Sequence, residues 1–492
     1  MPFSNTITTL PEIDLVMEQS MQAFLAYKKV QASDRAAFLE RIAFEIEALG
    51  EVLIRTTQEE TNLPEARLLG ERGRTTMQLR MFAKMLLEGS WVEASIDHAI
   101  PEKVPAKPDI RKMLVPSGPV VVFGASNFPY AYSTAGGDTA SALAGGCTIV
   151  VKAHPAHIKT SSLIATAISN AIEFCKMPKH CFQHVAGTSF EIGKALVQNS
   201  YTSAVGFTGS FSGGRALYDY AAIRPKPIPV FSEMGSTNPV LLLSDALAHN
   251  AETIAAQYAG SITLGVGQFC TNPGLLIAVA SEGLDKFKIT LSNAINQVAP
   301  AKMLHEGILK AYENNRSKAL ATNGVTAISN ENAANENYAT PIIAHVIGNG
   351  FLRNENLKEE VFGPYAMLVE CADMEELKKV WNTVSGQLTT SIMGTDKDFE
   401  DYPDLIEMAT MIAGRVLLNG VPTGVEVCAS MVHGGPYPAT TDSRFTAVGI
   451  NAVKRWVRPV CYQNCPDHLL PDALKECNPL QIKRMIDGNP YQ

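Results

Sequence analysis

VVVFGAS (120–126) and CTIVVKA (147–153) are the two short apolar runs that decide the fold class. Both are rich in β-branched residues and too short for a buried helix, so each predicts a strand covered on both faces. The same pattern returns in TSAVGFTGS (202–210), NPVLLLS (238–244) and GLLIAVA (274–280). Helical patterns such as SSLIATAISNAIEF (161–174) separate these runs, and this alternation indicates parallel sheets. We therefore expect an α/β protein.

Composition sets the bounds on domain number and on partners. The chain has 492 residues, of which 46% are apolar and 18% charged, enough for about three domains of ~150 residues. Its net charge of -8 and pI of about 5.8 argue against a nucleic-acid or anionic-membrane surface. There is no signal-peptide pattern and no apolar run near the ~18 residues of a membrane helix. Nine scattered cysteines do not resemble a disulfide framework, so we expect a cytoplasmic protein.

Two segments bracket the predicted strands. Residues 12–90 follow a helical period, and Pro101, Pro105 and Pro108 then break any helix, as is typical of an exposed edge segment. Near the other end, Cys461 and Cys465 have the spacing of metal ligands. A structural zinc site needs four ligands, however, and the nearby sequence offers no second pair. We expect no metal.

Four stretches hold residues with chemical potential, and each also has a purely structural interpretation. FTGSFSGG (207–214) follows a predicted strand and opens a helix, which suits either a phosphate or a tight turn. Lys152 ends a strand, where nucleotides bind in open α/β sheets. Glu233 lies beside apolar neighbours and could act as a base, or be a loop carboxylate. Cys270 sits in GVGQFCTNPG, as a nucleophile or an inert thiol.

A set of motifs in order along the chain favours the functional interpretation of these stretches over the structural one. They are SNFP (126–129), VVKAHP (150–155), FTGS (207–210), EMGSTNP (233–239), GQFC (267–270), EEVFGP (359–364) and PTGVEV (422–427). With them the chain resembles the aldehyde dehydrogenase superfamily along nearly its whole length. The resemblance implies a Rossmann-like NAD(P)-binding domain (1–96 and 116–234) and an α/β catalytic domain (235–436). It also implies an oligomerisation element with the C-terminal tail (97–115 and 437–492), and hence a homodimer or homotetramer.

The resemblance also implies a role for each matching residue. Cys270 matches the nucleophile, Glu233 the general base that hydrolyses the thioester, and Asn127 the side-chain donor to the oxyanion. Residues that match the cofactor site are Lys152 at the adenine ribose, Gly209, Ser210 and Gly214 at the pyrophosphate, and Glu360 and Phe362 at the nicotinamide ribose and ring. The presence of Glu233 favours hydrolysis over transfer to coenzyme A. A catalytically silent member of the fold is the remaining alternative.

Two positions depart from the common family pattern. Ser126 stands where many members have tryptophan before the asparagine. Pro155 stands where many have a glutamate that binds both ribose hydroxyls. A carboxylate there would repel a 2'-phosphate, so its absence makes NADP acceptable and favours it slightly over NAD.

The finer resemblance is to a subgroup whose members oxidise 2,5-dioxopentanoate (alpha-ketoglutaric semialdehyde) or long-chain aldehydes. It is carried by MVHGGPYPATTDSRFTAVG (431–449) and RPVCYQNCP (458–466), among other stretches. We expect 2,5-dioxopentanoate as substrate, with a fatty aldehyde as the alternative. Phe128 and Phe269 flank the catalytic residues and would line an apolar tunnel. A substrate carboxylate needs hydrogen-bond donors at the far end of the tunnel. We name Arg444 with the hydroxyls of Thr440, Thr441 and Ser443 as these donors. The alternative is that these residues form a purely structural loop.

Overall fold

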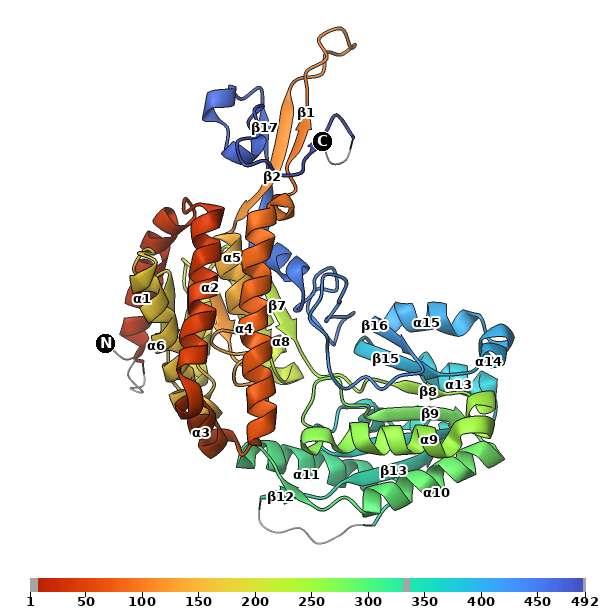
Figure 1. Ribbon diagram of the computed structural model, residues 1–492. Coiled ribbons are helices and arrows are strands. Elements are labelled where there is room, and N and C mark those ends of the chain that lie inside the picture. The colour runs from red at the N-terminus through yellow and green to blue at the C-terminus, as the bar shows by residue number, and fades with distance from the viewer. Residues whose placement is uncertain (1–7, 331–336, 490–492) are drawn as a thin grey trace.

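The structure, a computed structural model, describes residues 8–330 and 337–489. It consists of two α/β bodies and a narrow arm that projects from one of them (Figure 1). This arrangement confirms the expected α/β class with parallel sheets. No helix within the described ranges is long and apolar enough to span a membrane.

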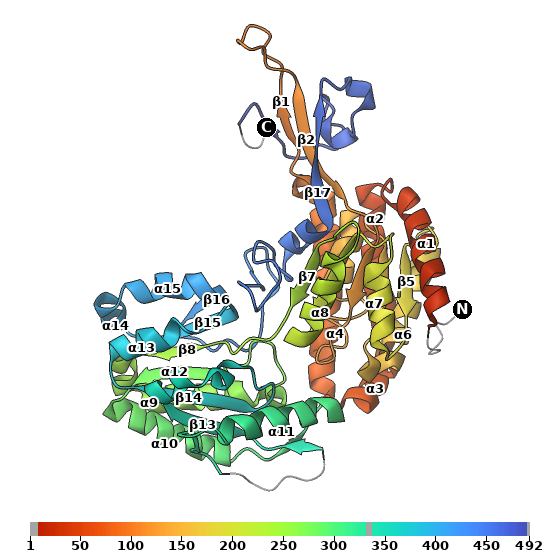
Figure 2. The ribbon, with the colours of Figure 1, turned by 180° about the vertical axis from the view of Figure 1, so that it is seen from behind.

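The first body is built on a five-stranded parallel sheet with the order β5-β4-β3-β6-β7. Its strands are β3 (Val120–Phe123), β4 (Ile149–Lys152), β5 (Phe182–Val185), β6 (Ala204–Thr208) and β7 (Val230–Glu233). One face packs on α2 (Ala32–Ala48), α3 (Gly50–Thr61), α4 (Glu65–Glu88), α5 (Gly137–Gly145) and α6 (Ile158–Phe174). The other face packs on α1 (Leu10–Tyr27), α7 (Phe190–Gln198) and α8 (Phe211–Ala222), as the reverse view shows (Figure 2). The four-residue apolar strands are covered on both sides, which explains their lack of polar alternation.

The second body holds a seven-stranded sheet with the order β11-β13-β14-β9-β8-β15-β16, parallel except at β11. Its strands are β8 (Val240–Leu242), β9 (Leu275–Val279), β11 (Thr326–Ala327), β13 (Ile342–Ile347), β14 (Tyr365–Cys371), β15 (Gln387–Met393) and β16 (Ala413–Leu418). α9 (Ser244–Thr263) and α10 (Glu282–Asn296) cover one face. On the other face lie α11 (Glu306–Leu320), α12 (Gly348–Arg353), α13 (Met374–Trp381) and α15 (Asp404–Ile412). The short α14 (Asp396–Asp401) precedes α15, and β10 (Ala301–Lys302) pairs with β12 (Tyr338–Ala339).

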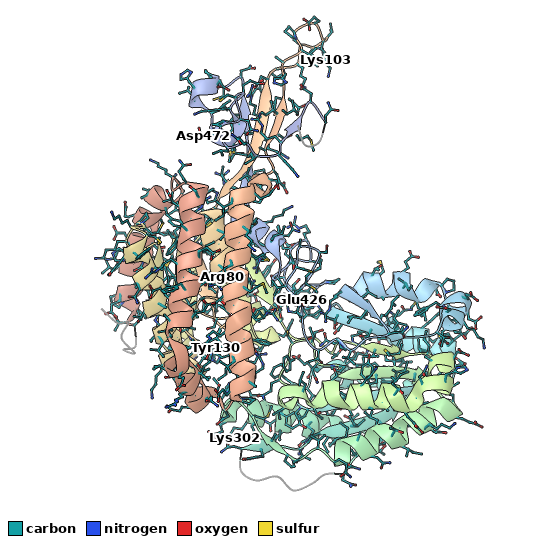
Figure 3. The ribbon with its side chains drawn as sticks, in the orientation of Figure 1. Arg80, Lys103, Tyr130, Lys302, Glu426 and Asp472 are labelled. Atoms are coloured by element: carbon teal, nitrogen blue, oxygen red, sulfur yellow. The ribbon has the colours of Figure 1, made fainter. Side chains whose placement is uncertain are left out.

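The arm is a four-stranded sheet whose strands come from opposite ends of the chain. It contains β1 (Ser95–Asp97), β2 (Ile110–Pro116), β17 (Val457–Gln463) and β18 (Met485–Ile486). The proline-spaced segment forms its tip, where Figure 3 labels Lys103. The domain boundary expected at residue 437 stays a prediction. Ala452, Val453 and Trp456 are buried in the core of the first body, because the apolar turn at 450–456 packs against α5 before the chain enters the arm.

Candidate active site

The loop that carries Cys270 is held in a strained conformation. Gly265, Val266 and Gly267 have consecutive positive φ angles of 55°, 59° and 63°. A β-branched residue rarely adopts this region, so the packing around Val266 must impose it. A Cβ on Gly267 would lie 2.1 Å from the carbonyl oxygen of Gly363, so only glycine fits there. The loop that carries Cys270 is therefore packed tightly against the segment that leads into β14.

Asn238 fixes the other side of this loop. Its buried side-chain amide donates to the carbonyl oxygens of Cys270 at 2.9 Å and Asn272 at 2.8 Å. Gln387 accepts from the backbone N–H groups of Thr237 and Asn238, which ties the segment to β15. The sequence motif EMGSTNP contains Asn238, but its clamping role depends on contacts that the motif alone does not reveal.

Cys270, His433 and Glu233 form one cluster. His433 Nε2 lies 3.5 Å from Cys270 Sγ and 2.9 Å from Glu233 Oε1. His433 and Glu233 are both buried, and the second carboxylate oxygen, Oε2, has no hydrogen-bond partner among the described residues. Three separate segments meet here: the end of β7, the loop after α9, and the stretch that follows β16. His433 was not predicted as a site residue, although it lies in the quoted stretch MVHGGPYP.

The electrostatics of the cluster keep the thiol protonated. Burial raises the pKa of Cys270 well above its ordinary value, and the negative charge of Glu233 raises it further. A thiol is a poor nucleophile until it loses its proton. His433 and Glu233 stand where that proton can go, so the arrangement supports a thiol that is activated only when it reacts. The atoms of Cys270, His433 and Glu233 that could ligate a metal ion lie within 4.8 Å of one another. Among the described residues, no cluster of three potential metal ligands includes Cys461 or Cys465.

Asn127 lies at the carboxyl end of the central strand β3. Its side-chain amide donates one N–H to the carbonyl oxygen of Gln268, 3.1 Å away and two residues before Cys270. An amide has a second N–H, which this contact leaves free. The structure thus brings Asn127 beside the loop that carries Cys270.

The residues expected at the adenosine and pyrophosphate lie at the carboxyl ends of strands in the five-stranded sheet. Lys152 ends β4, and Gly209 and Ser210 join β6 to α8. These are carboxyl ends on the two sides of β3, the place where open α/β sheets bind nucleotides. Ser210 caps α8 by accepting the N–H of Gly213, and a Cβ on Gly214 would approach Met234 Cγ at 2.7 Å. The glycine there serves the close packing of α8 on β7.

Lys152 supplies the test of whether a dinucleotide fits. Within the described ranges its ammonium has no hydrogen-bond or ion-pair partner, and loss of solvation lowers its pKa to about 8. An unpartnered cation next to a helix N-terminus suits hydroxyl and phosphate oxygens. Pro155 opens the short helical turn Pro155–His157 just beyond Lys152, and places no carboxylate there. The site therefore fits NAD or NADP.

Glu360 and Phe362 lie on the loop before β14, next to the nucleophile loop. Glu360 accepts the N–H of Ser236 at 3.3 Å, and burial raises the pKa of its carboxyl to about 7. Phe362 and Glu360 line one small cavity together with Phe269. The two residues expected at the nicotinamide end thus lie close to Cys270, whose pKa the charge of Glu360 also raises.

A cavity of about 340 Å³ opens over Cys270. Phe128 and Phe269 both line it, with their rings 5.7 Å apart and edge to face. Tyr132 continues the aromatic wall, its ring 5.2 Å from that of Phe128. Arg444 is not among the lining residues. Its side chain is 79% exposed and forms an ion pair with Asp442, two residues away, so the local carboxylate keeps it at the surface.

A nucleotide-type sheet beside a half-buried cysteine and a buried histidine and glutamate is the architecture of a nicotinamide-dependent oxidoreductase with thiol chemistry. The family model described as "Aldehyde dehydrogenase family" matches residues 6–436, and the chain belongs to this family. It is therefore an oxidoreductase that acts on aldehyde groups with NAD or NADP.

Two curated relatives match almost the whole chain. The "Alpha-ketoglutaric semialdehyde dehydrogenase 2" of Azospirillum brasilense is 47% identical over 97% of this chain and 91% of its own. The "Alpha-ketoglutaric semialdehyde dehydrogenase" of Acinetobacter baylyi is 44% identical over 98% of this chain and 91% of its own.

Solved structures share the fold at low identity. The methylmalonate-semialdehyde dehydrogenase of Oceanimonas doudoroffii superposes with a TM-score of 0.79 at 18% identity, covering 94% of this chain and 92% of that one. The NADP-dependent glyceraldehyde-3-phosphate dehydrogenase of Bacillus halodurans, solved with NADP, gives 0.78 at 20% identity, with 93% and 92% covered.

Proposed function

We propose that this enzyme oxidises 2,5-dioxopentanoate to 2-oxoglutarate, with Cys270 as nucleophile. The observation that carries the proposal is the Cys270–His433–Glu233 cluster, whose Cys270 lines a cavity that also holds cationic side chains. The names of the two relatives at 47% and 44% identity support the choice of substrate. A cavity with both aromatic and cationic walls suits a short aldehyde that carries a carboxylate better than a fatty chain.

In the first half of the reaction the Cys270 sulfur attacks the aldehyde carbon. The thiol proton passes to the hydrogen-bonded pair of His433 and Glu233, which lie within reach of Sγ. The resulting oxyanion accepts hydrogen bonds from the free amide N–H of Asn127 and from the backbone N–H of Cys270. In a comparable site one such donor contributes about 2.7–4 kcal/mol. When bound, the nicotinamide supplies the hydride acceptor that turns this adduct into a thioester.

In the second half Glu233 activates water. Its Oε1 is held by His433, while its buried Oε2 lacks a partner within the described residues and can accept a proton from water. A carboxylate fixed on one side and free on the other is well placed as a general base. Before this step the pair releases the first thiol proton to solvent, so that Glu233 is again a carboxylate. The water gives one proton to Glu233 as it attacks the thioester carbon, the carbon–sulfur bond breaks, and that proton passes to the Cys270 sulfur.

We propose further that NADP serves at least as well as NAD. Lys152 is a free cation at the ribose end, and Pro155 leaves out the carboxylate that would repel a 2'-phosphate. Gly209, Ser210 and Gly214 would shape the pyrophosphate turn, and Glu360 and Phe362 would position the nicotinamide end.

The arm is the element that we assign to subunit association, with a homodimer or homotetramer as the result. The two α/β bodies are assigned to cofactor binding and to catalysis. The nine cysteines are all free thiols, as suits a reducing cytoplasm.

The decisive experiment is the ratio of kcat/KM for 2,5-dioxopentanoate to kcat/KM for pentanal or hexanal. A ratio above about ten, worth ~1.4 kcal/mol of transition-state discrimination, is expected. A ratio near or below one would instead assign the enzyme to long-chain aldehydes. Detection of a coenzyme A thioester as product would replace hydrolysis by acyl transfer.

A further inference from the structure

The cavity over Cys270 contains two arginines that the mechanism does not use. Arg67 and Arg74 both come from α4 and line the cavity. They are seven residues apart, about two helical turns, and so lie on one face of the helix. Gly70 lies between them on the same face, where an added Cβ would meet no atom within 4 Å. A glycine in the middle of a helix costs about 1 kcal/mol, and here it leaves open space between two cations.

The charge of Arg67 is already balanced. Its guanidinium forms an ion pair with Glu71 Oε2 at 2.9 Å and stacks 4.3 Å from the centre of the Phe128 ring. The other oxygen of the buried Glu71 accepts the backbone N–H groups of Tyr130 and Ala131. Arg67 is therefore a structural cation that holds the aromatic wall.

The charge of Arg74 is not balanced by any close carboxylate. Within residues 8–330 and 337–489 its one recorded hydrogen bond is from a guanidinium N–H to the Tyr132 hydroxyl, at 3.3 Å. Its Nε is buried without a hydrogen-bond partner, and no ion pair within 4.0 Å includes it in this part of the chain. Arg74 feels the charge of Glu71 only at longer range, and Glu71 is already paired with Arg67. A half-buried guanidinium without an ion pair of its own is costly. Its position at the wall of an open cavity implies that the missing partner is an anion that enters the cavity.

We propose that Arg74 binds the carboxylate of the substrate while the aldehyde carbon lies at Cys270. This assignment rests on the proposed function and deepens it. A guanidinium presents two parallel N–H groups that match the two oxygens of a carboxylate. This geometry best distinguishes a substrate that ends in a carboxylate from one with an uncharged end. Tyr132 supports the site, because its hydroxyl accepts from Arg74 and keeps its own proton to donate. Burial raises the pKa of Tyr132 well above its ordinary value, so this proton is retained at neutral pH.

A competing role for Arg74 has a different signature. Its positive charge also lowers the pKa of the Cys270 thiol. If that were its main contribution, its loss would slow the oxidation of every aldehyde by a similar factor. A carboxylate receptor affects charged substrates selectively, so the quantity to measure is the ratio of kcat/KM between charged and uncharged aldehydes.

The test compares Arg74→Gln, Arg74→Lys and the wild type on 2,5-dioxopentanoate and hexanal. For Arg74→Gln we expect this ratio to fall about 10- to 100-fold, the range for loss of a hydrogen bond to a charged group. Arg74→Lys keeps the positive charge but not the two parallel N–H groups, so the ratio should fall less than in Arg74→Gln. Arg80→Gln is the matched control, because Arg80 is on the same helix but pairs with Glu47 on the outer surface (Figure 3). It should leave the ratio unchanged.

The outcomes separate this proposal from the proposed function. A wild-type ratio near one contradicts the substrate assignment itself, and the receptor role with it. A high wild-type ratio that survives in Arg74→Gln, or a fall that is equal for both aldehydes, overturns the role of Arg74 and leaves the substrate in place. If Arg74→Gln does not fold, the same comparison with Arg74→Lys decides, since an unchanged ratio there overturns bidentate recognition.

Discussion

His433 Nε2 lies 2.9 Å from Glu233 Oε1, although the two residues are 200 positions apart in the chain. The same nitrogen lies 3.5 Å from Cys270 Sγ, so the imidazole is shared between the nucleophile and the base. The thiol therefore has a route for its proton that does not pass through solvent. Both half-reactions depend on this one ring.

Replacement of His433 by glutamine should lower kcat about 100-fold, near the low end for loss of a general acid–base group. Steady-state rates and the rate of Cys270 alkylation by iodoacetamide would both decrease. His345→Gln is the control, because His345 on β13 contacts Glu370 on β14, away from the cluster. Wild-type rates in His433→Gln would mean that Glu233 alone handles the thiol proton.

The alkylation rate of Cys270 should rise with pH. Burial and the charge of Glu233 raise the pKa of this thiol above its ordinary value of 9.0, so little thiolate exists at neutral pH. Below the pKa the thiolate fraction grows about tenfold per pH unit, and the rate should still be rising at pH 9. Mass spectrometry of the labelled peptides measures it, with the exposed Cys461 as internal reference. Cys270→Ala should lose the label and the activity but keep its fold and cofactor binding. A plateau below pH 8 would contradict a protonated resting thiol.

Glu233→Gln should uncouple the two half-reactions. His433 remains within reach of Cys270 and can accept the thiol proton, so the thioester still forms and one equivalent of reduced cofactor per subunit appears in a burst. Little turnover follows, because water is not activated. Stopped-flow absorbance measures the burst amplitude. Loss of the burst itself would show that Glu233 is needed to deprotonate Cys270, and an unchanged steady state would assign water activation to another group.

Pro155→Glu should shift cofactor preference toward NAD. The new carboxylate would lie just beyond Lys152 and repel the 2'-phosphate of NADP. The ratio of kcat/KM for NADP to that for NAD should decrease, with Pro155→Gln as the uncharged control. If the wild type binds NAD tightly and does not bind NADP, the argument from Pro155 is wrong.

Gly70→Leu and Gly73→Leu form a matched pair on α4. Neither added Cβ meets an atom within 4 Å, and replacing a mid-helix glycine should stabilise the fold by about 0.8–1 kcal/mol in both. Only Gly70 lines the cavity. We therefore expect similar increases in Tm, but a higher KM for the aldehyde in Gly70→Leu alone. Equal kinetics in the two variants would place the substrate elsewhere.

The elements that could be predicted from sequence are those set by local pattern. The apolar runs at 120–126 and 147–153 contain β3 and β4. They could be recognised because a strand buried on both faces is a continuous apolar run without alternating polar residues. Cys270, Glu233 and Asn127 were predicted as site residues from short motifs, and their catalytic roles stay predictions. The family and the aldehyde-oxidising activity followed from those motifs, and the comparisons confirmed both.

The residues that were missed act through long-range contacts. His433 and Asn238 lie in the quoted stretches MVHGGPYP and EMGSTNP, and Arg74 lies in none of the motifs. The contacts of all three are made by segments that meet only in the folded protein, which local sequence does not show. Arg444 was nominated from nearby hydroxyls, but Asp442 satisfies it locally. The domain boundary at 437 stays a prediction, and the contribution of the turn at 450–456 to the core of a sheet more than 200 residues earlier in the chain could not be read from local pattern.

That late contribution has a consequence for how the protein is made. Trp456 donates to Ser141 Oγ at 2.7 Å, and Arg455 pairs with Asp138 at 2.7 Å, so the last turn before the arm seals the first body. Domains generally fold in order as they leave the ribosome. Here the first body cannot close its core until residue 456 has emerged, after the whole second body has been synthesised. The nascent chain must therefore keep an apolar surface of the first body exposed while the second body is synthesised.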